Sequence, residues 1–303
     1  MLTNINTIVL ASQSKVPATI AISVSLPTLS TLAVSLRLYT RRFILGWIGP
    51  DDWLIVIALV LAISTSVAII LEAFRGMGTH VWTVTPVMLL EQMKALYASI
   101  LTYNMANNII KMSFLLQYRR IFGSSSPTAD RVCYWFFFFI MLWAIMQAIL
   151  LSVACIPVAK IVPIMAGKCL DTLPVWCFSA GLNIITDFFI FAIPLPFVYN
   201  LTMQIRQKVL VFTIFSFGFF TCIISIIRLI YLRIVTVTED LTWDNVELTL
   251  WSIGELNSGI VCASVQTLRP LISRFILGLT PSSSTEGSRA HTLSELIPHT
   301  VVS

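Results

Sequence analysis

Four ionisable side chains lie inside long apolar stretches of this 303-residue chain: Lys111, Asp187, Arg228 and Glu255. A charge at membrane depth is costly, so such residues generally face the interior of a helix bundle and find a partner there. Two are cations and two are carboxylates, so opposite charges can neutralise each other. Residues of these types can lock helices together, bind an ion or a small ligand, or relay protons.

The first candidate pair is Lys111 with Asp187. One predicted helix carries a polar stripe made of Asn104, Asn107, Asn108 and Lys111. Asn183 and Asp187 are four residues apart and share a helix face. With a rise of about 1.5 Å per residue, Lys111 and Asp187 lie within about 6 Å of the same depth. We therefore predict an ion pair between them, because an opposite charge is what keeps each group ionised at low dielectric.

Arg228 and Glu255 form a second candidate pair, toward the outer half of the bundle. Arg228 could instead extend to the lipid headgroups, since it lies about one helical turn from the outer boundary. Asn257, in the same stretch as Glu255, is a further candidate polar site. An alternative use of Asp187 and Glu255 is proton donation into an apolar cavity.

The composition of the chain indicates the environment that surrounds these charges. The chain is 57% hydrophobic and 11% charged, with a mean hydropathy of +0.89, whereas a soluble domain carries roughly a quarter charged residues. A polytopic membrane protein is therefore predicted, with the lipid bilayer as its first partner. The net charge of +5 is spread over short segments, so no nucleic-acid partner is expected. The six cysteines lack C-x-x-C spacing and the three histidines are scattered, so we expect no metal site and no cofactor.

The positioning elements are seven apolar stretches, each long enough for a helix to cross a hydrocarbon core about 30 Å thick. They lie at about 17–37, 53–74, 95–117, 132–155, 175–199, 209–232 and 247–269. The third is the weakest because its asparagines and Lys111 dilute it. The predicted fold is an all-α, seven-helix transmembrane bundle over residues 17–275.

The orientation of the bundle follows from its basic residues. Eleven of the 19 Lys and Arg residues fall on one side of the predicted membrane and six on the other, and Lys111 and Arg228 account for the rest. The richer side is cytosolic by the positive-inside rule. Residues 1–16 are then a short extracellular tail, and residues 276–303 are a disordered, Ser/Thr-rich cytosolic tail. The plasma membrane is the expected location.

Asp51, Asp52 and Trp53 open the second stretch at its cytosolic end. Acids at a helix N-terminus suit the helix dipole, and tryptophan suits the membrane interface. Three arginines at the end of the preceding stretch could pair with the acids: Arg37, Arg41 and Arg42. We interpret this group as structural.

Two prolines, Pro194 and Pro196, free backbone carbonyls and are predicted to kink the fifth helix at its cytosolic end. Cys155 and Cys169 bracket a short outer loop, where the oxidising environment makes them candidates for a disulfide. Cys177 is the rival partner. The last stretch contains no lysine for a retinal Schiff base, so a chromophore is excluded.

Six blocks of the chain, in order, resemble the fungal rhodopsin-like domain family of integral membrane proteins, which includes Pth11-like receptors and proteins like satratoxin cluster protein 4. The blocks are RLYTRRFILGWIGPDDWLIVIALVLA, GMGTHVW, KMSFLLQYRRIF, DFFIFAIPLPFVYNL, FGFFTCIISIIRLIYL and LWSIGELNSGIVCASVQTLRPLISRF. The resemblance runs from about Arg37 to Phe275. It implies counterparts for Asp51, Asp52, Asp187, Arg228, Glu255, Cys155 and Cys169. This chain lacks the cysteine-rich N-terminal module of one such receptor and the aromatic residue usual between the two loop cysteines.

The resemblance implies a seven-helix fungal membrane protein, with members that look like surface-sensing receptors and others that occur near secondary-metabolite genes. The favoured hypothesis is a non-enzymatic, receptor-like protein that senses a small molecule or a surface cue and meets a cytosolic G-protein-like partner. The alternative is a membrane-embedded enzyme, such as an acid-catalysed cyclase, or a transporter that serves a metabolite gene cluster.

Overall fold

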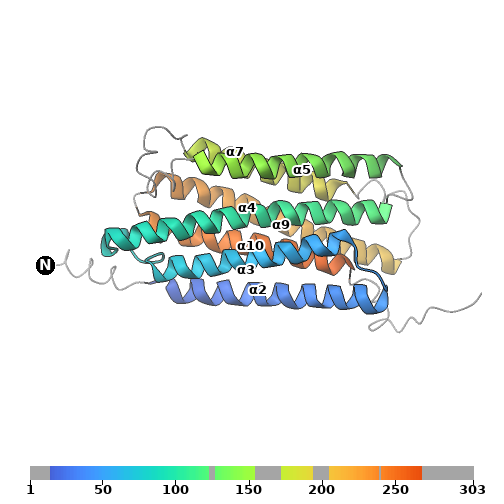
Figure 1. Ribbon diagram of the computed structural model, residues 1–303, viewed down its shortest axis with the longest axis horizontal. Coiled ribbons are helices and arrows are strands. Elements are labelled where there is room, and N and C mark those ends of the chain that lie inside the picture. Colours follow the sequence, from blue (N-terminus) through green and yellow to red (C-terminus); the bar gives the residue numbers. More distant parts are fainter. Residues whose placement is uncertain (1–13, 123–126, 154–171, 194–204, 239, 268–303) are drawn as a thin grey trace, which may run out of the picture.

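The structure is a computed structural model that describes residues 14–122, 127–153, 172–193, 205–238 and 240–267, without the side chains of 121–122, 172 and 205–217. This part of the chain contains seven α-helices and no strand. The helices run side by side along the long axis of the molecule (Figure 1). The prediction of an all-α membrane bundle is confirmed.

Each described helix overlies one of the seven predicted spans. The helices are α2 (Val16–Tyr39), α3 (Pro50–Phe74), α4 (Pro86–Phe122), α5 (Pro127–Val153), α7 (Thr172–Ala192), α9 (Ile205–Val237) and α10 (Leu241–Thr267), with a π-helical turn, η1 (Thr40–Ile44), after α2. Helix α4 begins nine residues before the predicted span at 95. Glu91, Gln92 and Lys94 interrupt the apolar run of its first turns, yet the structure buries Gln92 and Met93 there.

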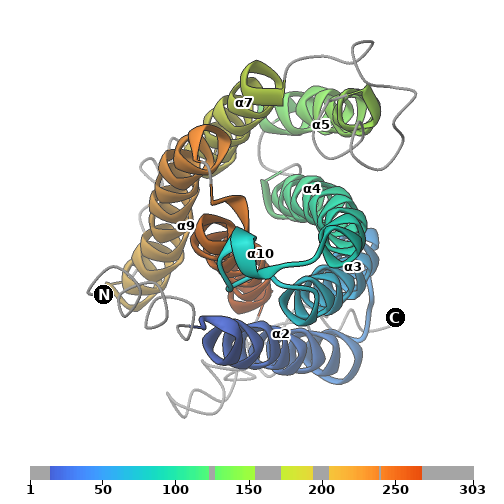
Figure 2. The same cartoon turned by 90° about the vertical axis from the view of Figure 1, so that its left-hand side faces the viewer.

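Two of these helices are less apolar than membrane spans generally are. Among the described residues, five segments are long and apolar enough to cross a membrane, and α4 and α10 do not supply any of them. Helix α10 lies in the middle of the bundle and contacts α2, α3, α4 and α9 (Figure 2). Inner helices meet protein rather than lipid, so their polar side chains can be hydrogen-bonded by neighbours.

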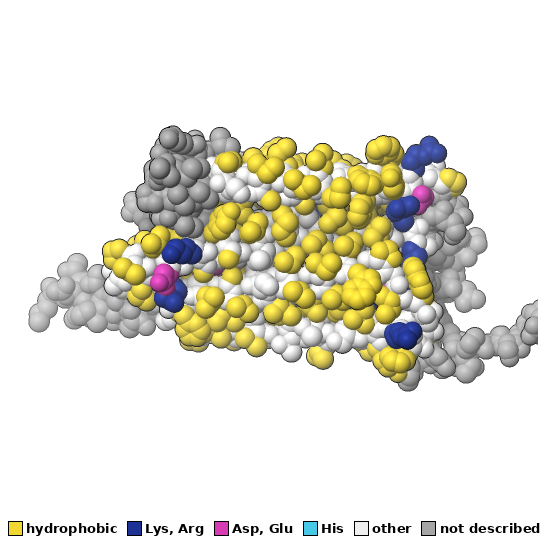
Figure 3. All heavy atoms as spheres, viewed as in Figure 1, with side chains coloured by type: hydrophobic (Ala, Val, Ile, Leu, Met, Phe, Trp, Pro, Cys, Tyr) yellow, Lys and Arg dark blue, Asp and Glu magenta, His cyan; other side chains and the backbone are white. Residues whose placement is uncertain are grey.

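The outer surface of the bundle suits lipid. Hydrophobic side chains cover the middle of the face in Figure 3, and Lys and Arg gather at its two ends. Large apolar side chains project outward from separate helices, including Leu32, Val60, Leu142 and Phe188. A soluble monomer rarely exposes so large an apolar surface. The bilayer is therefore the environment of this belt.

Small residues let the inner helices approach closely. Ala58 and Ala62 of α3, Ala106 of α4 and Ala263 of α10 all belong to one buried core cluster. Without a hydrophobic driving force between helices in lipid, close van der Waals packing at small side chains holds such bundles together.

The acids at the start of α3 bind two of the three arginines predicted to meet them. Arg37 Nε lies 2.8 Å from Asp52 Oδ1, and Arg37 Nη2 lies 2.8 Å from Asp51 Oδ2. Arg41 Nη2 lies 3.1 Å from Asp51 Oδ2. Arg42 is exposed instead. Asp52 also accepts a hydrogen bond from the Gly49 amide, which caps α3.

This cluster joins four helices at one end of the bundle. Arg37 Nη1 donates to the Ala263 carbonyl of α10 at 2.5 Å, and Ser113 of α4 donates to the Asp51 carbonyl at 2.8 Å. Trp53, next to the acids, projects outward with 63% of its surface exposed, as a tryptophan at the membrane interface does. The contacts agree with the structural interpretation of Asp51 and Asp52.

A cap closes the opposite end of the bundle. The segment between α3 and α4 folds over the start of α10 (Figure 2). There the His80 ring stacks between Trp82 and Trp243, with ring centroids 4.4 Å apart on each side. His80 Nδ1 lies 2.5 Å from Asp240 Oδ2. The Gly78 amide donates to the Thr242 carbonyl at 2.9 Å. The cap ties α10 to the turn after α3.

Replacing Gly78 with alanine is expected to weaken this cap. Gly78 has φ +88°, and an added Cβ would lie 3.2 Å from the Val16 backbone nitrogen. A left-handed conformation costs a non-glycine residue about 1–2 kcal/mol, so the free energy of unfolding should fall by at least that amount. SDS titration of the purified protein in mixed micelles measures it. The control is Gly181→Ala in α7, where nothing lies within 4 Å of the new Cβ. That variant should gain about 0.5–1 kcal/mol, and equal effects of the two changes would contradict the argument.

Candidate functional site

The predicted pair Lys111 and Asp187 meets at the centre of the bundle. Lys111 Nζ on α4 lies 3.0 Å from Asp187 Oδ1 on α7. The ammonium also donates to Asn183 Oδ1 at 2.6 Å, to the Asn183 carbonyl at 2.9 Å and to Thr186 Oγ1 at 2.7 Å. All four residues are buried. The predicted ion pair is confirmed, and further polar atoms of α7 complete the lysine's coordination.

The second predicted pair also forms. Arg228 Nε on α9 lies 2.8 Å from Glu255 Oε2 on α10. Arg228 is 9% exposed, so it does not extend to the headgroups. Its guanidinium lies over the ring of Tyr103, with Cζ 4.8 Å from the ring centroid. The Tyr103 hydroxyl donates to Glu255 Oε2 at 2.8 Å.

Shared hydrogen bonds join the two pairs into one assembly. Asn183 Nδ2 donates to Glu255 Oε1 at 2.7 Å, so one side chain contacts both Lys111 and Glu255. Ser225 Oγ lies 2.7 Å from Glu255 Oε1 and 3.3 Å from Asp187 Oδ2. Two cations and two carboxylates cancel in formal charge, which lowers the cost of burial.

We call this assembly the charge network. Its members are Tyr103, Asn107, Lys111, Asn183, Thr186, Asp187, Ser225, Arg228 and Glu255. They come from α4, α7, α9 and α10. A change at any one of these helices therefore alters contacts of the other three.

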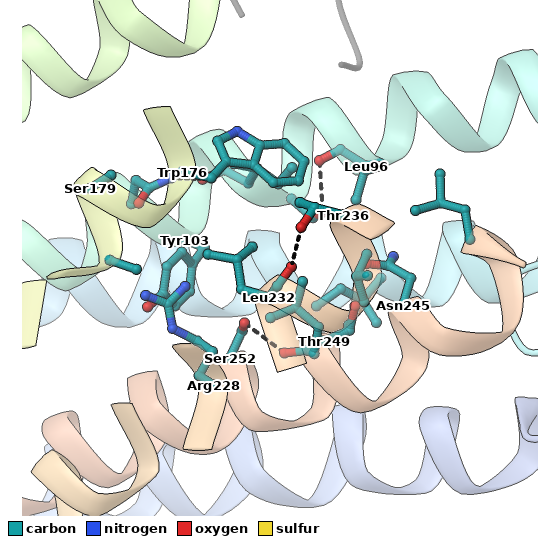
Figure 4. A pocket seen from close by; sticks show the side chains of 18 of the residues that line it. Leu96, Tyr103, Trp176, Ser179, Arg228, Leu232, Thr236, Asn245, Thr249 and Ser252 are labelled. Atoms are coloured by element: carbon teal, nitrogen blue, oxygen red, sulfur yellow. Dashed lines mark hydrogen bonds between the residues drawn. The ribbon is translucent and has the colours of Figure 1, made fainter. Parts of the chain in front are cut away.

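A cavity of about 630 Å³ lies against the charge network. Residues of α3, α4, α7, α9 and α10 line it, and Tyr103 and Arg228 are shared with the network. Figure 4 shows Arg228 and Tyr103 together at one end of the cavity and Asn245 toward the other. Ligand pockets have about this size, with mostly apolar walls and a few polar groups. The cavity can therefore hold a small molecule in contact with Arg228.

Comparison with known protein families finds a match for this architecture. Residues 36–274 match the model of the fungal rhodopsin domain. The chain belongs to the fungal rhodopsin domain family. The matched region of this rhodopsin-domain protein contains the whole charge network and every residue that lines the cavity. The family resemblance inferred from the six blocks is thus confirmed.

Three relatives of this rhodopsin-domain protein carry informative names. It is 25% identical over 288 residues to the polyenoic acids biosynthesis gene cluster protein Ba17b of Metarhizium anisopliae, covering 88% of this chain and 77% of that one. It is 25% identical over 313 residues to receptor GIN3 of Arthrobotrys oligospora, covering 93% and 71%. It is 30% identical over 204 residues to an SAT4 family membrane protein of Emericella nidulans, covering 66% and 51%. No solved structure matches the chain.

The remaining predicted polar residues of this rhodopsin-domain protein lie beside the charge network. Asn108 Nδ2 donates to Gln147 Oε1 at 2.8 Å, and Gln147 Nε2 donates to Asn104 Oδ1 at 2.9 Å and to Ser179 Oγ at 2.5 Å. These contacts join α4 to α5 and α7. Asn257 is separate, and its Oδ1 accepts a hydrogen bond of 2.6 Å from Ser30 on α2. Asn104 and Asn108 thus brace the network, whereas Asn257 holds α10 against α2.

Sequence reasoning missed several residues of the site. Tyr103, Asn107 and Lys111 follow at intervals of four, a helical spacing that could have drawn Tyr103 into the stripe. Ser225 precedes Arg228 by three residues and shares its face. Glu72, at the end of α3, is fully buried, and its Oε1 accepts a hydrogen bond of 2.6 Å from Ser99. Among the described residues no cation pairs with Glu72.

Several predicted residues lie outside the described part of the chain: Pro194, Pro196, Cys155 and Cys169. Cys177, the rival disulfide partner, is a free cysteine in the structure. Within the described residues no three His, Cys, Asp or Glu side chains converge as metal ligands.

Proposed function

We propose that this rhodopsin-domain protein is a non-enzymatic, receptor-like sensor of a small-molecule or surface-borne cue. One observation carries the proposal. The cavity that can hold a ligand is lined by Arg228 and Tyr103, and both of these side chains bind Glu255 inside the charge network. A molecule in the cavity therefore reaches the network directly. The relative named receptor GIN3, which aligns with 93% of this chain, supports the proposal.

The charge network supplies a route from the cavity to the helices. A ligand that contacts Arg228 competes with Glu255 for the guanidinium. Glu255 also accepts hydrogen bonds from Tyr103, Asn183 and Ser225, so a shift of its carboxylate disturbs α4, α7 and α9 together. A ligand shifts a conformational equilibrium only through contacts that differ between the two states. The Arg228–Glu255 contact is the one that changes in this mechanism.

The direction of signalling rests on the orientation predicted from the basic residues. The cavity lies at the end of the bundle where α2 begins and α9 ends, which is the outer end if the N-terminus is outside. The other end would then present to a G-protein-like partner in the cytosol the helix ends that contain Arg119, Arg120, Arg206 and Lys208. Plasma-membrane location belongs to the same proposal.

An enzyme or transporter of a metabolite gene cluster is the second candidate, favoured by the relatives named for polyenoic acids and wortmanamides biosynthesis clusters. An acid-catalysed cyclase needs a proton donor that faces its substrate. Asp187 and Glu255 instead bind Lys111 and Arg228, and neither carboxylate lines the cavity. This arrangement favours the sensor proposal over an acid-catalysed cyclase.

Complementation of a strain that lacks the gene tests the sensor proposal. Deletion and complemented strains are grown on hydrophobic film and in liquid culture, and the transcripts that respond to the surface are compared by RNA sequencing. Wild type should restore the response, and Arg228→Ala should lose most of it at equal amounts of protein in the membrane. Arg233→Ala is the matched control, an exposed arginine on the same helix. A normal response in the deletion strain or in Arg228→Ala overturns the proposal. Conversion of cluster intermediates by microsomes, lost in Asp187→Asn, would favour the enzyme.

A further inference from the structure

We propose that the cavity is specific for an amphipathic acid: a carboxylate that binds Arg228, carried on a single apolar chain. The inference rests on the proposed function, because it names the class of cue that the cavity accepts. It follows from the charge, the free hydrogen-bond donors and the apolar surface of the cavity wall.

Charge is the first argument. Among the described residues that line the cavity, Arg228 is the only one with a formal charge, and none is a carboxylate. At the opposite end, Thr238 donates to Asp244 Oδ2 at 2.5 Å, so an acid stands just behind the wall there. Glu72 also lies behind the wall, where the lining residue Ser99 donates to its Oε1 at 2.6 Å. A carboxylate in the cavity is attracted to Arg228, which lines it with Glu255 behind, and repelled from the Thr238 and Ser99 sides. The charges therefore give the ligand one orientation.

Free donors are the second argument. Arg228 Nε lies 2.8 Å from Glu255 Oε2 as an ion pair without a hydrogen bond, and none of the described residues forms a hydrogen bond with Nη1 or Nη2. Figure 4 shows the guanidinium beside Tyr103 at the wall of the cavity. A guanidinium presents parallel N–H groups that match the two oxygens of a carboxylate. Arg228 can thus bind a ligand carboxylate through Nη1 and Nη2, and the added negative charge weakens its contact with Glu255.

The effect on Glu255 is the third point. A second carboxylate at Arg228 weakens the attraction between Arg228 and Glu255. Glu255 keeps three neutral donors within 2.8 Å, from Tyr103, Asn183 and Ser225. These hydrogen bonds stabilise the carboxylate when the guanidinium is shared. The network can therefore admit an anion without leaving Glu255 unsatisfied.

The apolar chain follows from the rest of the wall. Leucines and Trp176 line the cavity between its ends: Leu96, Leu173, Leu232, Leu241 and Leu248. The hydroxyls along this wall are already engaged, since Thr236 donates to the Leu232 carbonyl at 3.1 Å and Ser252 to the Leu248 carbonyl at 2.8 Å. The indole N–H of Trp176 has no hydrogen-bond partner among the described residues, but it is buried away from the surface, so a polar ligand body would find few accessible partners along this wall. A hydrocarbon chain gives up no hydrogen bonds when it enters, and the burial of its apolar surface away from water is favourable.

Competition binding tests the proposal. The full chain is purified into nanodiscs of uncharged lipid, and displacement of dansylundecanoic acid is followed with dodecanoic acid, dodecanol and methyl dodecanoate. Empty nanodiscs and an Ala180→Phe variant, which fills the cavity wall, give the background. Dodecanoic acid should bind at least tenfold more tightly than dodecanol, a difference of about 1.4 kcal/mol.

We expect variants of Arg228 to lose the preference for dodecanoic acid over dodecanol. Arg228→Gln should weaken dodecanoic acid about tenfold and leave dodecanol unchanged, whereas Arg233→Gln should behave as wild type. Because Arg228→Gln leaves Glu255 without its cation, the double variant R228Q/E255Q is measured as well. It keeps a neutral network, and the preference for the acid should be absent there too.

Three results would overturn the inference. Equal displacement by the acid, the alcohol and the ester would show a cavity that binds amphiphiles without regard to charge, and the sensor proposal would stand. Displacement by phosphatidic acid as strong as by dodecanoic acid would assign the site to a bilayer lipid. Displacement that is unchanged in Ala180→Phe would place the binding elsewhere. The complementation experiment uses none of these probes, so failure of the sensor proposal is seen separately.

Discussion

Replacement of Arg37 by methionine is expected to lower the free energy of unfolding by about 3–5 kcal/mol, because it removes one partner of a buried ion cluster. Arg37 is fully buried and binds Asp51, Asp52 and the Ala263 carbonyl with three separate nitrogens. Methionine fills a similar volume but leaves the two carboxylates with Arg41, the Gly49 amide and a longer contact of 3.6 Å from Arg120. The loss should appear in SDS titration of the purified protein in mixed micelles and as a smaller amount of folded protein in the membrane.

Two further variants show whether the charge itself causes this loss. Arg42→Met changes an exposed arginine in the same turn and should leave stability within about 0.5 kcal/mol of wild type. Arg37→Met combined with Asp52→Asn should lose less than the sum of the two single changes, since the pair is removed together. Additive losses would mean that Arg37 acts by packing alone.

The fold could be predicted because helix formation in lipid leaves few alternatives. Every backbone polar group must be satisfied within its own segment, so apolar stretches of sufficient length become helices. The extent of α4 could not be predicted from hydropathy. In its first turns, at 86–94, Glu91, Gln92 and Lys94 interrupt the apolar run, and the structure continues the helix through them with Gln92 and Met93 buried. The central position of α10 could not be predicted either, because a single sequence does not show which helices lie inside the bundle.

The site could be predicted only in part. Spacing and depth gave the pairs Lys111–Asp187 and Arg228–Glu255, because both depend on the regular rise and period of a helix. The link between the pairs depends on how each helix is rotated about its axis and on the rotamers of Asn183 and Ser225. The cavity depends on gaps between five helices. Neither can be derived from helical spacing.

The burial of Glu72 is a feature that its position in the sequence does not predict. A carboxylate at the end of a predicted span can reach the headgroups, so its position alone gives no reason to bury it. The structure buries it completely, with Ser99 as its hydrogen-bond partner. Tertiary packing of α4 against α3, not the hydropathy of the stretch, decides its environment.

Replacement of Lys111 by methionine is expected to have an equally large effect at the centre of the bundle. It removes the cation that lies 3.0 Å from Asp187, and among the described residues only Ser225 and Asn183 still donate hydrogen bonds to that buried carboxylate. Loss of one partner of a buried pair costs about 3–5 kcal/mol. The free energy of unfolding in mixed micelles measures this loss, and Lys94→Met, an exposed lysine on the same helix, is the control.

The double variant of Lys111→Met with Asp187→Asn shows whether this ion pair only holds the helices together or also takes part in signalling. It removes both charges, so most of the stability should return, as when a buried ion pair is replaced by neutral groups of similar volume. If the pair serves only to hold helices together, the double variant should also respond normally in the complementation assay. We expect it to fold and not to respond. Asn183 binds both Lys111 and Glu255, so without Lys111 and Asp187 a shift of Glu255 at the remaining pair is no longer passed to an ion pair between α4 and α7. A stable double variant with a full response would reduce this pair to a structural lock and confine sensing to Arg228 and Glu255.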